Sequence, residues 1–157
     1  MFKKSILPFL ISILIVFSFG FIGSFFTTSS ITNWYAFINK PLFSPPNWIF
    51  GPVWTLLYVL MGISAFLIWK KRDNLKTKSA FIFYGIQLIL NAFWSIIFFG
   101  MHNPGLAFLE IIILWIFILI TLIKFYKINK TAGLIFIPYL LWVSFASILN
   151  YAIWMLN

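Results

Sequence analysis

Hydrophobic residues along this chain are concentrated in five long runs that are separated by short polar connectors. The runs cover about residues 5–26, 48–69, 79–100, 105–125 and 131–156. Each is close to the roughly 20 apolar residues that an α-helix needs to cross about 30 Å of hydrocarbon. None alternates as a strand does, and backbone groups inside a bilayer must pair internally. The pattern therefore predicts an all-α integral membrane protein, a single five-transmembrane-helix bundle over residues 1–157.

The composition narrows the chemistry that the chain can perform. Of its 157 residues 63% are hydrophobic and 8% are charged, and the mean hydropathy is +1.06; a soluble domain carries about 25% charged residues. The absence of cysteine excludes disulfides and thiolate metal sites. One histidine and two acidic residues are too few for a His/carboxylate metal cluster or a usual hydrolytic triad. We therefore expect no metal site, no catalytic residues and no required cofactor.

The basic residues indicate a membrane orientation. Ten of the eleven fall on one side of the predicted bundle, namely Lys3, Lys4, the five between residues 70 and 78, and Lys124, Lys127 and Lys130. Only Lys40 falls on the other side. The positive-inside rule then places the N-terminus in the cytoplasm and the first connector and the C-terminus on the extracellular or periplasmic side. Because the net charge of +9 is explained in this way, we expect no nucleic-acid partner.

The first hydrophobic run could instead belong to a cleaved signal peptide, since it follows a basic start. Its apolar stretch of about 22 residues exceeds a typical signal-peptide core, and no A-x-A cleavage site follows it. These features favour a retained transmembrane helix.

The connector between the first two runs is unusual for a membrane protein. It covers about residues 34–54, holds four of the seven prolines and has tryptophan at both ends. A link between two helices needs only to be short and polar. We therefore interpret this segment as a rigid aromatic lid at a helix mouth, over a site for a flat apolar ligand.

Two predicted helices carry polar, small or aromatic residues at four-residue spacing. These are Gln87, Asn91 and Ser95 in the third run, and Trp142, Ala146 and Asn150 in the fifth. Residues so spaced share one helical face, and an unpaired amide in hydrocarbon is costly. Each face therefore contacts protein, through interhelical hydrogen bonds or close packing, or a ligand in a pocket.

Glu110 is the only acidic residue inside a predicted span. It lies near the start of its helix, where the macrodipole favours a negative charge. Two interpretations remain open. The carboxylate accepts a hydrogen bond from a Trp, Tyr or Asn of a neighbouring helix, or it takes part in proton or ligand chemistry.

Taken together, several sequence blocks resemble the TspO/MBR family, the tryptophan-rich sensory proteins related to the mitochondrial translocator protein or peripheral benzodiazepine receptor. The blocks are Trp34-Tyr35, Lys40-Pro41, Pro45-Pro46-Asn47-Trp48, Pro52-Val53-Trp54-Thr55-Leu56-Leu57-Tyr58, Met61-Gly62, Gln87-x3-Asn91-x2-Trp94-Ser95, Phe98-Phe99, Pro104-Gly105-Leu106-Ala107 and Pro138-Tyr139-x2-Trp142-x2-Phe145-Ala146-x3-Asn150. They occur in order across essentially the whole chain.

The resemblance implies a five-helix bundle, often a homodimer, with a pocket that opens toward the first connector. Family members bind porphyrins such as protoporphyrin IX and haem, as ligands, and also isoquinoline carboxamide or benzodiazepine-type drugs. Carried over by position, the lid and mouth residues are Tyr35, Pro45, Pro46 and Phe50, and the pocket wall is Trp54, Tyr58, Gln87, Asn91, Trp94, Trp142, Ala146 and Asn150. Ligand rings would stack on Trp54 and Trp142, while the amides of Gln87 and Asn91 would bond ligand carbonyls or carboxylates.

Four functions are consistent with these features. The leading hypothesis is a membrane sensor or receptor that binds a tetrapyrrole. A transporter of porphyrins or other apolar solutes is the second, although the chain lacks the internal repeat and broken helix pair of many transporters. Light- and oxygen-dependent porphyrin breakdown, which the resemblance also implies, is the third. The fourth is a structural bundle for partner assembly, for which Gly20-x3-Ser24 is a candidate packing pair.

Overall fold

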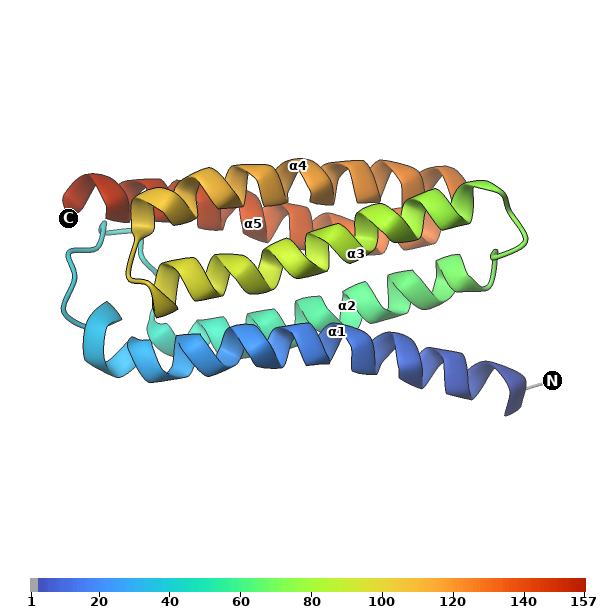
Figure 1. Ribbon diagram of the computed structural model, residues 1–157, viewed down its shortest axis with the longest axis horizontal. Helices are drawn as coiled ribbons and strands as arrows, with labels where there is room; N and C mark the ends of the chain where they lie inside the picture. Colours follow the sequence, from blue (N-terminus) through green and yellow to red (C-terminus); the bar gives the residue numbers. More distant parts are fainter. Residues whose placement is uncertain (1–2) are drawn as a thin grey trace.

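Five long helices make up most of the protein (Figure 1). The computed structural model describes residues 3–157. The helices are α1 (Lys3–Ser30), α2 (Phe50–Trp69), α3 (Lys76–Ser95), α4 (Pro104–Ile128) and α5 (Lys130–Leu156). Within residues 3–157, these five are long and apolar enough to cross a membrane. The predicted all-α bundle of five transmembrane helices is therefore confirmed.

Three short turns modify the helix ends. The π-helical turns η1 (Ile31–Tyr35) and η3 (Ile96–Gly100) continue α1 and α3, and the 3-10 turn η2 (Asn47–Ile49) leads into α2. Because η1 prolongs the first helix to Tyr35, the start of the predicted connector, about residues 34–54, is helical.

The prediction of membrane orientation uses ten basic residues. The side chains of two of them, Lys3 and Lys4, lie outside the part of the chain that the structure describes.

Asparagine side chains begin the last two helices. The Asn103 side chain accepts a hydrogen bond from the backbone N–H of Leu106 at 3.0 Å, with Pro104 in the first turn. Asn129 accepts from the N–H of Ala132 at 3.2 Å. Such caps satisfy backbone donors that have no partner inside the helix. The two asparagines thus set where α4 and α5 begin.

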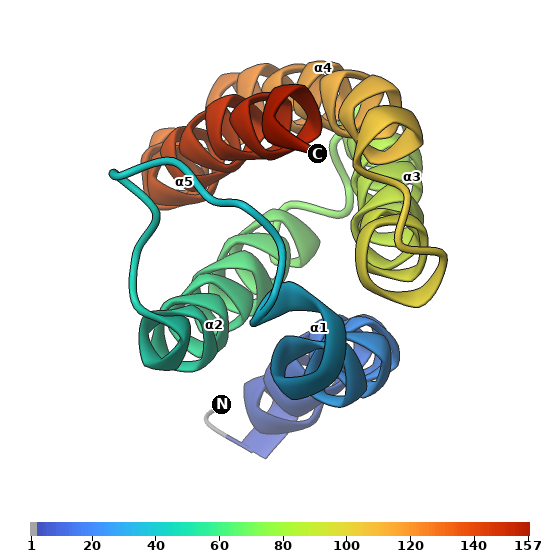
Figure 2. The same cartoon turned by 90° about the vertical axis from the view of Figure 1, so that its left-hand side faces the viewer.

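The helices form a ring in the order α1, α2, α5, α4, α3. Figure 2 looks along the ring from the end where the α1–α2 connection crosses it. Each helix packs closely on its two neighbours in this order, whereas α2 and α3, which follow each other in the chain, barely touch. Side chains from all five helices fill the middle of the ring, and a space remains at each end where α1 forms one wall.

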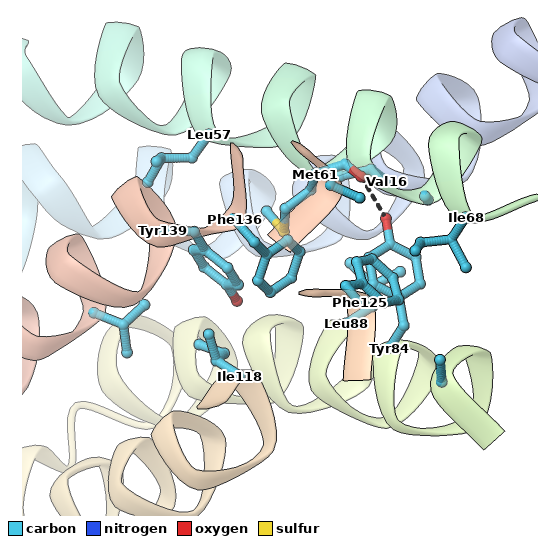
Figure 3. Close-up of a cluster of buried hydrophobic side chains, with 14 of the residues drawn as sticks. Val16, Leu57, Met61, Ile68, Tyr84, Leu88, Ile118, Phe125, Phe136 and Tyr139 are labelled. Carbon is cyan, nitrogen blue, oxygen red and sulfur yellow. Dashed lines mark hydrogen bonds between the residues drawn. The ribbon is translucent and has the colours of Figure 1, made fainter. Parts of the chain in front are cut away.

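Aromatic side chains form the core in the middle of the ring (Figure 3). The ring centroids of Phe125 lie 5.5 Å from those of Tyr84 and Phe136, and Phe136 lies 5.4 Å from Tyr139. The Tyr84 hydroxyl donates to the carbonyl oxygen of Met61 at 3.3 Å. Phe125, Phe136 and Tyr139 are completely shielded from solvent. This cluster therefore joins α2, α3, α4 and α5.

A chain of buried hydrogen bonds lies beside that core. Tyr58 donates to Asn91 Oδ1 at 3.3 Å, and Asn91 Nδ2 donates to the Tyr139 hydroxyl at 3.0 Å. Tyr139 in turn donates to Gln87 Oε1 at 2.8 Å. Gln87 Nε2 lies 3.9 Å from the sulfur of Met61. Asn91 and Gln87 of the third helix therefore form hydrogen bonds with tyrosines of α2 and α5. Interhelical bonding was one of the two alternatives predicted for this face.

Replacing Tyr139 by phenylalanine tests this network. Tyr139→Phe removes the hydroxyl between Asn91 and Gln87 and leaves both amides short of a buried partner. We expect the free energy of unfolding to fall by about 1 kcal/mol, the scale of a hydrogen bond inside a helical membrane protein. Equilibrium unfolding in mixed detergent micelles measures the change. Tyr151→Phe, the same change at a half-exposed position on α5, is the control, and equal effects of the two variants would contradict the role given to the network.

Candidate ligand-binding cavity

A cavity of about 420 Å³ lies at one end of the ring. The first connector crosses this end (Figure 2). Its wall is formed by α1 with η1, α2, α3 with η3, and α5. Its volume lies within the roughly 300–1,000 Å³ of small-molecule pockets. Eight residues predicted for the site line it, namely Tyr35, Phe50, Trp54, Tyr58, Trp94, Trp142, Ala146 and Asn150.

Aromatic rings that brace one another make up most of this wall. The rings of Trp54 and Tyr58 have centroids 5.5 Å apart. On α3, Trp94 is stacked on Phe98 at 5.1 Å with 23° between the ring planes. Trp142 of α5 packs edge-on against Phe50 at 6.2 Å. Since each large ring is held by another, the cavity is pre-formed and presents flat apolar surfaces to whatever enters it.

Asn150 fixes the α5 side of the cavity. Its Oδ1 accepts from the indole Nε1 of Trp94 at 2.9 Å, and its Nδ2 donates to the carbonyl oxygen of Pro104 at 2.7 Å. The amide therefore ties α5 to both α3 and the start of α4. Ala146 lies one turn before it and is also part of the wall. Asn150 thus positions the Trp94 ring and has its own amide occupied by protein.

The connector over the cavity is anchored at two places. The Lys40 ammonium donates to the carbonyl oxygens of Tyr35 at 2.6 Å and Ile38 at 3.2 Å, and lies 4.8 Å from the centre of the Tyr35 ring. At the same end of the bundle, the Asn39 N–H donates to Asn157 Oδ1 at 3.0 Å, and Asn157 Nδ2 donates to the Asn39 carbonyl oxygen at 2.9 Å. The connector is therefore held to the end of α1 and to the end of α5.

Four of the twelve predicted residues lie outside the cavity wall. Pro45 and Pro46 carry the connector into α2, and the carbonyl oxygen of Pro46 accepts from the N–H of Ile49 at 3.0 Å in the η2 turn. Gln87 and Asn91 are buried in the hydrogen-bond network behind the wall. Their amides bond protein groups there, and the link to the cavity runs through Tyr58, which donates to Asn91.

Sequence reasoning assigned no residue of the first helix to the site, yet α1 supplies one side of the wall. Gly20, Gly23, Ser24 and Thr27 all line the cavity. A Cβ at Gly20 would overlap the Tyr58 ring, so glycine lets α1 approach α2 at this level. The Gly20-x3-Ser24 pair was the available signal, and the structure places both residues on the cavity wall.

Glu110 is buried on α4, and among residues 3–157 neither of its carboxylate oxygens has a hydrogen-bond partner. The expectation that a neighbouring Trp, Tyr or Asn donates to Glu110 is therefore wrong. Its helix provides no part of the cavity wall. The Trp94 indole and the Asn150 amide, which are possible donors on α3 and α5, bond each other instead.

This helix bundle is similar in sequence to known membrane proteins of one family. The model of the TspO/MBR family matches residues 12–155. The chain is 46% identical over 155 residues to the tryptophan-rich protein TspO of Archaeoglobus fulgidus, covering 98% of this chain and 99% of that relative. It is 36% identical over 137 residues to the translocator protein of Homo sapiens, covering 85% and 80% of the two chains. It is 36% identical over 125 residues to the tryptophan-rich sensory protein of Cereibacter sphaeroides, covering 80% and 77%.

These similarities extend over nearly all of the five membrane-spanning helices and include every helix that lines the cavity. The chain is thus an integral, multi-pass membrane protein and belongs to the TspO/MBR family.

Proposed function

We propose that this protein is a membrane sensor or receptor that binds a flat tetrapyrrole, such as protoporphyrin IX or haem, in the cavity beneath the first connector. The observation that carries the proposal is the aromatic wall of a cavity of about 420 Å³, to which α2, α3 and α5 each contribute a tryptophan. The name of one relative, the tryptophan-rich sensory protein of Cereibacter sphaeroides, supports a sensing role.

The wall suits a planar, largely apolar macrocycle. Trp54, Trp94 and Trp142 offer indole faces, and the rings packed against them leave each face in one orientation. Stacking on pre-oriented aromatic groups adds about 0.5–1.5 kcal/mol per ring to the burial of apolar area. In this proposal Gln87 and Asn91 act indirectly, because their amides hold Tyr58 and Tyr139 in place.

Lys40 is the basic residue at this end of the bundle, and it gives a porphyrin a preferred direction. The side chain lies over Tyr35, which lines the cavity, and its present acceptors are two neutral carbonyl oxygens. A carboxylate is a stronger acceptor for an ammonium group. We therefore place the propionate carboxylates of a porphyrin at the mouth beside Lys40, with the macrocycle inside. The charge asymmetry of the connectors supports a mouth on the extracellular or periplasmic side.

Transport is the second candidate, because the human relative carries the name translocator protein. A transporter has to move its ligand across the membrane, whereas a sensor has only to bind it. Uptake of porphyrin by proteoliposomes is compared with uptake by empty liposomes. If the rates are equal while the purified protein binds porphyrin, the result supports a sensor rather than a transporter. Porphyrin loss that requires the protein, light and oxygen together would instead indicate breakdown.

The Trp54→Ala substitution tests the aromatic wall. We expect the dissociation constant for protoporphyrin IX to rise about ten-fold, since stacking on one aromatic side chain contributes about 1–3 kcal/mol. Titration in the dark, followed by the absorption of the porphyrin, measures it without relying on the protein's own tryptophan fluorescence. Trp48→Ala, at an exposed tryptophan outside the cavity wall, is the control. Unchanged affinity of the Trp54 variant would place the ligand elsewhere.

The Lys40→Gln substitution tests the direction of the ligand. A lost charge-assisted hydrogen bond of about 1.5–3 kcal/mol should weaken the binding of protoporphyrin IX by about ten-fold or more. Its dimethyl ester, which carries no carboxylate, should bind the wild type and the variant equally. An equal loss for acid and ester would show that Lys40 acts by holding the connector rather than by pairing with the ligand.

A further inference from the structure

A second cavity, of about 340 Å³, lies at the opposite end of the ring from the first. Its wall comes from the N-terminal half of α1, the end of α2 and the beginning of α3. It exists because α2 and α3 barely touch each other and α1 alone covers the gap between them. Figure 1 shows α1 diverging from α2 toward this end.

The wall of this second cavity is almost entirely hydrocarbon and aromatic. Leu7, Ile11 and Ile15 of α1 take part in it and are also about half exposed or more on the membrane-facing side of the bundle. Trp69 and Phe81 contribute aromatic rings from α2 and α3. A cavity that joins the lipid-facing surface through such residues is suited to a flexible apolar chain entering from the bilayer.

One cationic side chain, Arg72, lies against the wall of the same cavity, and Lys70 lies beside that wall. The Arg72 guanidinium lies 4.3 Å from the centre of the Trp69 ring, which is part of the wall. Trp69 is stacked on Phe66 at 6.3 Å, and the Lys70 ammonium lies 5.7 Å from the Phe66 ring. The connector over residues 70–78 carries five basic residues and a single acidic one, Asp73. The apolar cavity thus ends at a positively charged rim.

We propose that this cavity binds an acyl chain of an anionic phospholipid from the leaflet that faces the basic end, with its phosphate headgroup held by Arg72 and attracted by the other basic residues of the connector over residues 70–78. The apolar wall accounts for the acyl chain, and the cationic rim accounts for the preference for a net negative headgroup. Each basic residue near a membrane surface contributes about a five-fold preference for anionic lipid.

Charge complementarity favours this occupant over a second copy of the chain. Two copies inserted in the same direction would bring two strongly basic ends together at one depth of the membrane. Repulsion between like charges opposes that arrangement, whereas an anionic headgroup neutralises the rim. A second copy is therefore an outcome that the experiment has to separate from lipid.

The test compares two phospholipids with identical acyl chains, phosphatidylglycerol and phosphatidylcholine. Each is titrated into the full chain in a neutral detergent, without porphyrin, and thermal unfolding is followed. We expect saturable stabilisation by phosphatidylglycerol at a concentration about ten-fold lower than by phosphatidylcholine. Equal half-saturation by the two lipids would overturn the proposal.

A pair of charge variants locates the headgroup. Arg72→Gln should reduce the preference for phosphatidylglycerol about five-fold. The matched control is Lys127→Gln, which removes one positive charge at the same end of the bundle but from α4, which provides no part of this cavity. An equal loss in both variants would mean a diffuse attraction of the basic end, which contradicts a defined site.

A second pair of variants locates the acyl chain. Gly85 lines the cavity, and no heavy atom lies within 4 Å of a Cβ built there, so a side chain can start at this position and Gly85→Leu should extend into the cavity. It should abolish the saturable stabilisation by both lipids and leave porphyrin binding at the other end unchanged. Ile82→Phe, at an exposed position of α3 outside the cavity wall, is the control. If Gly85→Leu leaves the stabilisation by lipid unchanged, the acyl-chain site is refuted. It is also refuted if the variant changes the oligomeric state of the protein instead of its response to lipid.

Discussion

The buried hydrogen bonds that run from Tyr58 through Asn91 and Tyr139 to Gln87 are the interaction on which the rest of this bundle depends. In a bilayer the lipid is as apolar as the interior of the protein, so hydrophobic burial gives little preference for one helix arrangement over another. Polar groups do give a preference, because an unpaired amide in hydrocarbon is costly. These four side chains connect α2, α3 and α5, although α2 and α3 barely touch directly.

The same network separates the aromatic core from the cavity. On one side, Tyr139 packs edge-on against Phe136 of the core. On the other side, the Trp54 ring lies 6.3 Å from Tyr139, and Tyr58 lines the cavity. Tyr58 is therefore the member of the network that lines the cavity, and it is connected through Asn91 to Tyr139. A ligand in the cavity would contact a tyrosine whose position is fixed through three helices.

The first helix gives the protein its two open spaces. It forms one wall of both cavities, with Gly20 and Gly23 at one end and Leu7 and Ile11 at the other. Much of its remaining surface is exposed apolar side chain, as expected for a helix at the edge of a bundle. Small residues bring α1 close to the Tyr58 ring at the first cavity, and α1 diverges from α2 toward the end that holds the second cavity.

The five spans, the charge asymmetry and the family follow from the sequence alone, because length, hydropathy and ordered motifs do not depend on how the helices pack. The sequence also identifies the two helix faces that carry Gln87, Asn91, Trp142 and Asn150. The ring order, the place of α1 in the cavity wall and the identity of the protein groups that the buried amides bond come from the tertiary structure. The physical reason is that periodicity shows which residues share a helix face, whereas in a chain that is apolar on almost every face it does not show which neighbour that face meets.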